Sequence, residues 1–322
     1  MPDKENKKQY GEFGDELDLK ELFLVLIRGK WIISSTLSFF LITGIFYSLS
    51  LPDIYESKAL LAPVDESDLP SGSLGGISGL AGLAGITLPT TDSSSNSKKA
   101  IEMMDSLNFF ENQIMPKIFL PNLIAVKSWD DETNTIFYDE SIFDITSNTW
   151  FKNSNNPEKS TPSAQQSYNV FKNSHLKIIP DDESGYIVLT VKHQSPFVAK
   201  KWTETVFEEI NSFYRQKDKA RSQNSVIYLN EQMAKTRFSE IKQVTAELLG
   251  QEIQKLTLIE ANSDYVFEYV YPPDVMEQKS EPNRLIIVLL FSFFGFVSGV
   301  IFVLIRSAFS SDEKQAVERF NS

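Results

Sequence analysis

Two long apolar runs, one near each end of the chain, dominate its pattern of hydrophobic and polar positions. Residues 31–51 and residues 285–305 each hold 21 consecutive positions without a charged side chain. At about 1.5 Å per helical residue, each run forms a helix of roughly 31 Å, which matches the hydrocarbon thickness of a bilayer. No small-residue cleavage pattern follows the first run, so we expect it to remain as an anchor. The pattern predicts two transmembrane helices.

Basic residues beside the two runs predict the orientation of the chain. Within 20 positions, the sides that carry the termini hold six Lys or Arg residues, whereas the sides that face the intervening segment hold three. Because cytoplasmic flanks are the more basic ones, we expect residues 1–30 and 306–322 to be cytoplasmic tails. Residues 52–284 are then expected on the opposite side of the membrane.

The intervening segment alternates between strand-like and helix-like patterns. Apolar and β-branched runs that end at turn residues indicate strands, and apolar residues three or four positions apart indicate helices. Ser163 and Gln166 form a capping-box pattern, which opens a helix. The predicted elements are a strand at 54–63, a helix at 95–116 capped by Ser97 and closed by Pro116, an irregular exposed insertion at 121–162, a short helix from Ser163 to about Lys172, a hairpin of 175–179 and 186–192, and a last strand at 264–273.

A long helical pattern precedes the last strand. Ser195 is suited to cap it and Pro196 to occupy its first position, and the pattern runs over about residues 196–262. Apolar residues seven positions apart form a coiled-coil-like stripe, which cannot be buried by one helix alone. Its partner is expected to be a helix of the same chain or of a neighbouring subunit. The stripe contains Ile227, Ala234, Phe238, Ile241 and Leu248.

Taken in order, these elements predict a membrane protein of the α+β class. The order is β-α-β-β-α-β, the split βαβ arrangement, with a transmembrane helix on either side. Because both ends of the sheet domain lead into the membrane, we expect a membrane-proximal base from which the long helical segment projects and comes back, at a turning point that the pattern does not locate.

Charge and composition exclude several classes of function. Residues 52–284 contain 22 basic and 33 acidic residues, which argues against a nucleic-acid partner. The chain has no cysteine, so it has no disulfide and no thiol chemistry. Its two histidines, His175 and His193, lack metal-ligand spacing. We therefore expect no catalytic residue, metal or cofactor, although sequence alone leaves open two carboxylates brought together by the fold.

Five stretches, in this order, resemble a known family. They are residues 15–31, 55–67, 80–86, 193–202 and 271–290. They are similar to the polysaccharide co-polymerases, of which the Wzz-type O-antigen chain-length determinants are the short members. The most specific stretch is the proline-rich motif before the second apolar run. Its residues are Pro272, Pro273, Pro282, Asn283 and Arg284.

The resemblance implies a function that composition and periodicity do not show. It implies a non-catalytic homo-oligomer of the bacterial inner membrane with cytoplasmic termini and a periplasmic domain. Such a protein controls how long a lipid-linked glycan grows in lipopolysaccharide biosynthesis, together with a Wzy-type polymerase. Two alternatives stay open. One is a capsular polysaccharide export subunit of the same superfamily, and the other is a two-span periplasmic sensor, for which 30 and 17 flanking residues leave no expected output module.

Two glycine patterns are candidate contact surfaces. In residues 75–86, no lysine follows with phosphate-loop spacing, so we interpret the segment as a packing surface, with a flexible spacer as the alternative. In the second apolar run, small residues one turn apart allow close helix contact with the first run, another subunit or the polymerase. The first surface comprises Gly79, Leu80, Gly82, Leu83, Gly85 and Ile86, and the second comprises Ser292, Gly295 and Gly299.

The segment before the first apolar run has the pattern of an amphipathic helix. Leu19, Leu22, Phe23, Leu26 and Ile27 follow the spacing of one helix face. Such a helix is predicted to lie along the cytoplasmic surface of the membrane.

Overall fold

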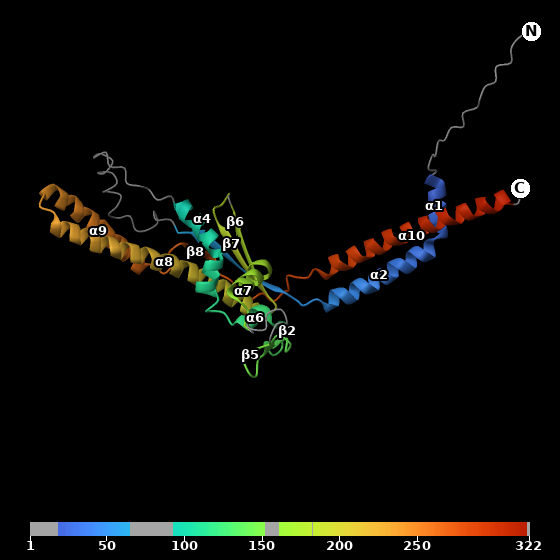
Figure 1. Cartoon of the computed structure of the whole chain (residues 1–322), viewed down its shortest axis with the longest axis horizontal. Helices are drawn as coiled ribbons and strands as arrows, with labels where there is room; N and C mark the ends of the chain where they lie inside the picture. The colour runs from blue at the N-terminus through green and yellow to red at the C-terminus, as the bar shows by residue number, and fades with distance from the viewer. Residues whose placement is uncertain (1–18, 65–92, 152–160, 182, 321–322) are drawn as a thin grey trace, which may run out of the picture. The chain divides into compact units, whose positions relative to one another are not determined.

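The computed structural model describes residues 19–64, 93–151, 161–181 and 183–320. The chain forms two compact units. One combines Met1–Pro52 with Pro282–Ser322, and the other is Asp53–Glu281. We call them the membrane unit and the extramembrane unit (Figure 1).

The membrane unit contains three helices, α1 (Leu19–Arg28), α2 (Lys30–Ser50) and α10 (Arg284–Phe320). The candidate spans are Lys30–Ser50 and Arg284–Ser307, with mean hydropathies of 1.8 and 2.8. Only 11% and 17% of their most apolar windows are buried, whereas a core helix of a soluble protein is buried on most sides. The two helices are therefore transmembrane, and they agree with the predicted runs to within a few residues.

The extramembrane unit is built on a four-stranded sheet of β6 (Leu176–Pro180), β7 (Ile187–His193), β1 (Tyr55–Pro63) and β8 (Phe267–Tyr271), in that order. All neighbouring strands are antiparallel, and Tyr55 of β1 lies opposite His193 of β7. Alternate residues of one face, such as Leu61, Leu189 and Phe267, are fully buried. This order confirms the predicted β-α-β-β-α-β arrangement, in which α8 packs on β1 and β7.

The hairpin between β6 and β7 has the predicted turn. Gly185 has a φ of +74°, and its backbone N–H donates to the Asp181 carbonyl at 2.8 Å. The Asp181 carboxylate accepts hydrogen bonds from the Glu183 N–H and the Ser184 hydroxyl. Asp181, Glu183 and Ser184 are exposed, so their hydrogen bonds stabilise a turn at the surface. Among the residues that the structure describes, no group of three His, Asp or Glu side chains is placed to hold a metal ion.

The predicted single helix at 95–116 is wrong, because the segment is broken. It forms α4 (Ser93–Met104), the short α5 (Leu107–Phe109) and a π-turn, η1 (Phe110–Ile114). Ser97 lies inside α4 and does not cap it. The break is at Ser106, whose hydroxyl accepts a hydrogen bond from the Phe109 N–H and so starts a new helix.

The predicted irregular insertion at 121–162 is also wrong over most of its described length. It contains α6 (Leu120–Ile124) and two small hairpins. Phe143 is buried and is surrounded by the rings of Phe119, Tyr138 and Trp150. Asn134 and Asn148 have positive φ, which asparagine tolerates well. The hairpins are β2 (Val126–Asp130) with β3 (Thr135–Tyr138), and β4 (Phe143–Asp144) with β5 (Thr149–Trp150).

The capping box before α7 (Ala164–Val170) is confirmed. The Ser163 hydroxyl accepts from the Gln166 N–H, and the Gln166 side chain accepts from the Ser163 N–H. The helix continues as a second π-turn, η2 (Phe171–His175), to the start of β6.

The long helical segment over about 196–262 comes back on itself as two helices, and the structure gives the turning point that the sequence pattern left open. The helix α8 (Pro196–Lys235) has 40 residues, Thr236–Phe238 form a turn, and α9 (Ser239–Ala261) returns along α8 (Figure 1). Thr236 and Phe238 both have extended backbone angles, which end one helix and allow the next to begin. Folding back buries part of each helix, which a single straight helix cannot do.

Candidate functional site

The two segments that connect the extramembrane unit to the spans bind one another. The Ile54 N–H donates to the Glu281 carbonyl at 2.9 Å. In return, the N–H groups of Ser280 and Glu281 donate to the Ile54 carbonyl at 2.8 and 3.2 Å. We call residues 53–57 together with 274–281 the linker clamp. Chain segments more than 200 positions apart in the sequence are thereby joined as a short antiparallel pair.

Ion pairs reinforce the linker clamp. Lys192 of β7 pairs with Glu281 and, at 3.2 Å, with Glu56, which also pairs with Lys58 at 2.8 Å. Lys279 pairs with Asp53 at 3.2 Å. Burial alone raises the pKa of Glu56, but hydrogen bonds from Lys58, Ser280 and Lys192 outweigh it and lower that pKa to about 2. The hydrogen bond to Glu281 raises the pKa of Lys192. Charged side chains therefore attach both linkers to the same end of the two central strands, β1 and β7.

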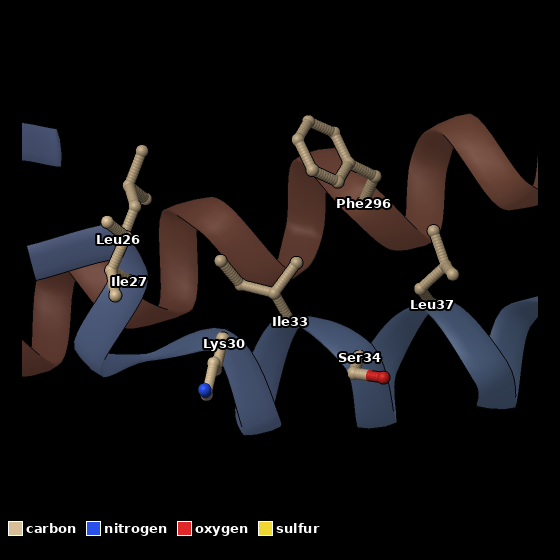
Figure 2. Close-up of a pocket in the computed structure, with 7 residues that line it drawn as sticks. All are labelled: Leu26, Ile27, Lys30, Ile33, Ser34, Leu37 and Phe296. Carbon is tan, nitrogen blue, oxygen red and sulfur yellow. The ribbon is translucent and has the colours of Figure 1, made fainter.

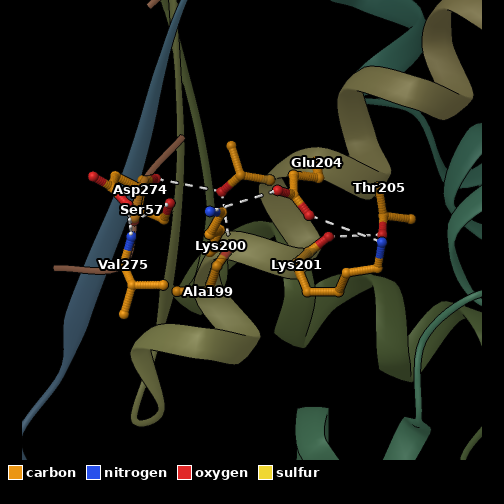
Figure 3. Close-up of polar contacts among 9 residues, drawn as sticks. Ser57, Ala199, Lys200, Lys201, Glu204, Thr205, Asp274 and Val275 are labelled. Atoms are coloured by element: carbon orange, nitrogen blue, oxygen red, sulfur yellow. Dashed lines mark hydrogen bonds and ion pairs between the residues drawn. The ribbon is translucent and has the colours of Figure 1, made fainter. Parts of the chain in front are cut away.

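Hydrogen bonds connect the linker clamp to the start of α8 (Figure 3). The Ser57 hydroxyl donates to the Asp274 carbonyl at 2.9 Å. The Thr203 hydroxyl of α8 donates to the Ala199 carbonyl at 2.8 Å and to the Ser57 carbonyl at 3.4 Å. The second linker, strand β1 and helix α8 are thus held by one chain of polar contacts.

The proline-rich motif is divided between the two units. Pro272 and Pro273 follow β8 in the extramembrane unit, where Pro273 is buried and Pro272 is exposed. Pro282, Asn283 and Arg284 belong to the membrane unit. The Asn283 side chain accepts from the Ile286 N–H at 3.4 Å, and Arg284 is the first residue of α10. A functional role of this motif stays a prediction.

The small residues of the second span face the first span. A Cβ atom on Gly295 would lie 2.7 Å from the Phe40 Cβ, and one on Gly299 would lie 2.3 Å from the Thr36 hydroxyl. Both distances are too short for a side chain, so only glycine allows this approach. Ser292 lies one turn earlier and donates its hydroxyl to the Val288 carbonyl at 2.8 Å.

The first span contributes two glycines that sequence reasoning did not single out. A Cβ atom on Gly44 would lie 2.7 Å from Phe291, and one on Gly29 would lie 2.4 Å from Val303. Side chains of α2 therefore pack against glycines of α10, and side chains of α10 pack against Gly44 of α2 and against Gly29 directly before it. The sequence contained a signal for both, because Gly29 lies two positions before the first apolar run and Gly44 is the single glycine inside it.

The stripe on the long helical segment is not buried between α8 and α9. Ile227, Phe238, Ile241 and Leu248 are 58%, 69%, 50% and 45% exposed, and Ala234 is exposed as well. Beyond the first sixteen residues of α8 (196–211), which hold its other buried side chains, the buried residues of the helical hairpin are Ser222, Thr245 and Ile259. Packing of the stripe within the chain is thus contradicted, because the chain turns at Thr236–Phe238 and the sevenfold spacing does not continue across a turn. A neighbouring subunit remains the predicted partner.

The two histidines form a buried cluster with Trp202, which the sequence did not predict. Their ring centroids are 5.8 Å apart, and each lies within 5.4 Å of the Trp202 ring. His193 Nδ1 accepts from the Ser195 N–H at 2.8 Å, so its Nε2–H donates to the Asn122 carbonyl at 2.9 Å. Burial lowers the pKa of His175, and it lowers that of His193 to about 4. Both rings are neutral and structural, and His193 connects the α6 region to the residue before α8.

The glycine segment at 75–86 lies outside the described residues. The proposed contact surface of Gly79, Leu80, Gly82, Leu83, Gly85 and Ile86 therefore stays a prediction.

The fold defines a class of protein: a two-span membrane protein with one α+β domain inserted between its spans. Residues 15–114 match the model of a family described as "Wzz: Chain length determinant protein". Over these residues, the match agrees with the resemblance of the sequence to the Wzz-type chain-length determinants. No curated protein matches the chain.

Two solved structures are similar to this chain at low sequence identity. A "full-length bacterial polysaccharide co-polymerase" is 15% identical over 91% of this chain and 99% of that chain, with a TM-score of 0.41. A "Fragment of WzzB, Polysaccharide Co-polymerase from Salmonella Typhimurium" is 13% identical over 71% of this chain and 100% of that chain, with a TM-score of 0.31.

Proposed function

We propose that this protein is a non-catalytic regulator of polysaccharide chain length, acting on O-antigen together with a Wzy-type polymerase. The match of residues 15–114 to the chain length determinant family carries this proposal. In this proposal the protein lies in the bacterial inner membrane, with both termini in the cytoplasm and residues 53–281 in the periplasm. The greater number of basic residues beside the terminal sides of the spans supports this orientation.

The proposed mechanism is that of a scaffold. The linker clamp holds the two linkers together at one sheet. The hydrogen bonds of Ser57 and Thr203 connect the clamp to α8. Within the extramembrane unit, a change at either linker would then reach the start of the long helical hairpin through these contacts. Such a scaffold can time or position a polymerase without chemistry of its own.

The scaffold is proposed to be a homo-oligomer. Ile241, Val244 and Leu248 lie on one side of α9 and are 50%, 57% and 45% exposed to water. Residues three and seven positions apart share a helix face, so these side chains form a continuous apolar strip. Burying apolar surface yields about 25 cal/mol per Å². A neighbouring copy that covers this strip therefore gains stability from it.

The function is tested by deleting the gene and separating the lipopolysaccharide by length on a gel. We expect the deletion to replace a modal cluster of long chains by a broad distribution, and the wild-type gene to restore the cluster. Unchanged O-antigen with intracellular accumulation of capsular polysaccharide would instead support the export subunit. Unchanged glycans of both kinds would contradict a role in polysaccharide assembly.

A further inference from the structure

The membrane unit contains a groove that the proposed function does not use. Its volume is about 370 Å³, and it lies between α1, the first turns of α2 and one side chain of α10 (Figure 2). This volume is within the range of about 300–1,000 Å³ that is common for small-molecule sites. The lining residues are Leu26, Ile27, Lys30, Ile33, Ser34, Leu37 and Phe296.

The groove exists because the chain changes direction at Gly29. The helix α1 ends at Arg28 and α2 begins at Lys30, so Gly29 separates two helices with different axes. Gly29 is buried, and a Cβ atom there would lie 2.4 Å from Val303. Phe296 of α10 lies over the side of α2 that carries Ile33 and Leu37 (Figure 2).

The chemistry of the groove combines an apolar wall with a cationic edge. Leu26, Ile33 and Leu37 are purely hydrocarbon, and Figure 2 shows Ile33 and Leu37 directed toward α10. Lys30 lies on the outer edge and is exposed. Arg28 precedes it by two positions, and α2 has no acidic residue in its first turn. The first turn of α2 therefore offers no carboxylate that could pair with Arg28 or Lys30.

The groove lies where the span begins. Lys30 is the first residue of the candidate span Lys30–Ser50, so its ammonium group belongs at the boundary between water and hydrocarbon. Leu37 is seven positions further, which is about 10 Å deeper at 1.5 Å per residue. An occupant must therefore have an anionic group at the surface and a hydrocarbon tail that extends inward.

We propose that this groove binds one anionic phospholipid, with its phosphate at Lys30 and Arg28 and an acyl chain along Leu26, Ile33 and Leu37. Basic residues beside grooves between transmembrane helices bind anionic headgroups in this way. The inference depends only on α2 crossing a bilayer, and not on the role of the protein in polysaccharide assembly. The binding therefore holds or fails independently of the proposed function.

The absence of cysteine from the chain allows a direct test in the full-length protein. Ser34→Cys and Ser35→Cys are matched labelling sites, because both serines are exposed at the same depth but only Ser34 lines the groove. Each variant is labelled with an environment-sensitive thiol fluorophore in nanodiscs. The nanodiscs contain phosphatidylcholine with increasing amounts of phosphatidylglycerol whose acyl chains are brominated, so that lipid bound beside the label quenches it.

We expect stronger quenching at Ser34→Cys than at Ser35→Cys at low phosphatidylglycerol content. Brominated phosphatidylcholine should quench both positions equally. Equal quenching of the two positions by both lipids would overturn the proposal, because it is the result expected of bulk lipid. At about 1 kcal/mol for each basic residue near the surface, Lys30→Gln should lower the preference for phosphatidylglycerol about fivefold.

A second pair of variants tests the apolar wall. Leu26→Trp fills the groove, whereas Leu24→Trp adds the same volume at a position of α1 that is 53% exposed and does not line it. We expect Leu26→Trp to abolish the preferential quenching at Ser34→Cys and Leu24→Trp to preserve it. Loss in neither or in both variants would contradict the assignment of the acyl chain to this groove. If a tryptophan variant fails to insert into the membrane, the comparison of Ser34→Cys with Ser35→Cys, with all other groove residues unchanged, still tests the proposal.

Discussion

The helical hairpin of the membrane unit and that of the extramembrane unit differ in how closely their two helices pack. In the membrane unit, α2 and α10 approach so closely that Phe40 and Thr36 of one lie against Gly295 and Gly299 of the other. In the extramembrane unit, α8 and α9 leave Phe238 and other large apolar side chains exposed to water. The first pair completes its contacts within the chain, and its remaining apolar surface faces lipid. The second pair carries apolar surface that the described residues of the chain leave exposed.

The largest expected effect is on the exposed strip of α9. Ile241→Glu together with Leu248→Glu places two charges on the surface that a neighbouring copy is proposed to cover. We expect loss of the oligomer, with an association constant lowered more than about a hundredfold, since unpaired buried charges are strongly unfavourable. Size-exclusion chromatography with light scattering, in detergent, measures this.

The matched control for the strip is Gln243→Glu, because Gln243 is exposed on α9 but does not belong to the strip. It should leave the oligomer intact. Normal oligomers from the double variant would show that the strip is not an interface. The apolar surface left exposed by α8 and α9 would then have no role in assembly.

The next largest effect concerns pH and the extramembrane unit. The pKa of His193 is lowered to about 4 by burial, compared with 6.5 for an ordinary histidine. Because the folded state holds the lower pKa, His193 stabilises the fold above pH 6.5, and this contribution is lost as the pH falls toward 4. The loss approaches about 3 kcal/mol.

Chemical denaturation between about pH 7 and pH 4 measures the contribution of His193. His193→Asn keeps a carbonyl that can accept from the Ser195 N–H but cannot be protonated in this range. The variant should therefore lose most of the pH dependence. An unchanged dependence would assign it to other groups, such as His175, whose pKa burial also lowers from its ordinary value of 6.5.

A smaller loss is expected in the membrane hairpin. At Gly299→Leu, the first side-chain atom alone would lie 2.3 Å from the Thr36 hydroxyl, so the two spans must separate. Overpacking of this kind costs about 1–3 kcal/mol. Thermal unfolding in detergent should show a lower midpoint than for the wild type. Gly299→Ala should have an intermediate midpoint, and equal midpoints for all three would contradict the close contact.

The smallest effect has the opposite sign. Gly250 lies inside α9, and an added Cβ atom would meet nothing within 4 Å. Gly250→Ala should therefore stabilise the helix by about 0.5–1 kcal/mol, because alanine restricts the unfolded chain without a clash. A denaturation midpoint lower than that of the wild type would show that this face of α9 is already covered.

The sequence predicted those features that depend on local pattern. The two apolar runs, the Ser163 capping box and the turn that ends at Gly185 each follow from residues close together in the chain, and all are confirmed. The order of strands also followed, because the order of elements and the connections between them restrict a sheet of this kind to few arrangements.

The sequence failed where side chains compete with the backbone or act over a distance. Ser106 divides one apparent helix by capping another, and Thr236 ends α8 without a proline or glycine to mark it. The aromatic residues around Phe143 are scattered along the insertion and meet only in the fold. The His193 cluster likewise joins residues from α6, β7 and α8.

The measurement that tests the account most directly is the length distribution of surface glycan in cells that carry the Ile241→Glu, Leu248→Glu double variant in place of the wild type. Immunoblots of the membrane fraction confirm that equal amounts of each protein are present. The account predicts that the variant leaves glycan lengths as broad as the gene deletion does, whereas Gln243→Glu restores the wild-type cluster. A normal cluster from a protein that no longer assembles would contradict the claim that chain length is controlled by an assembled scaffold.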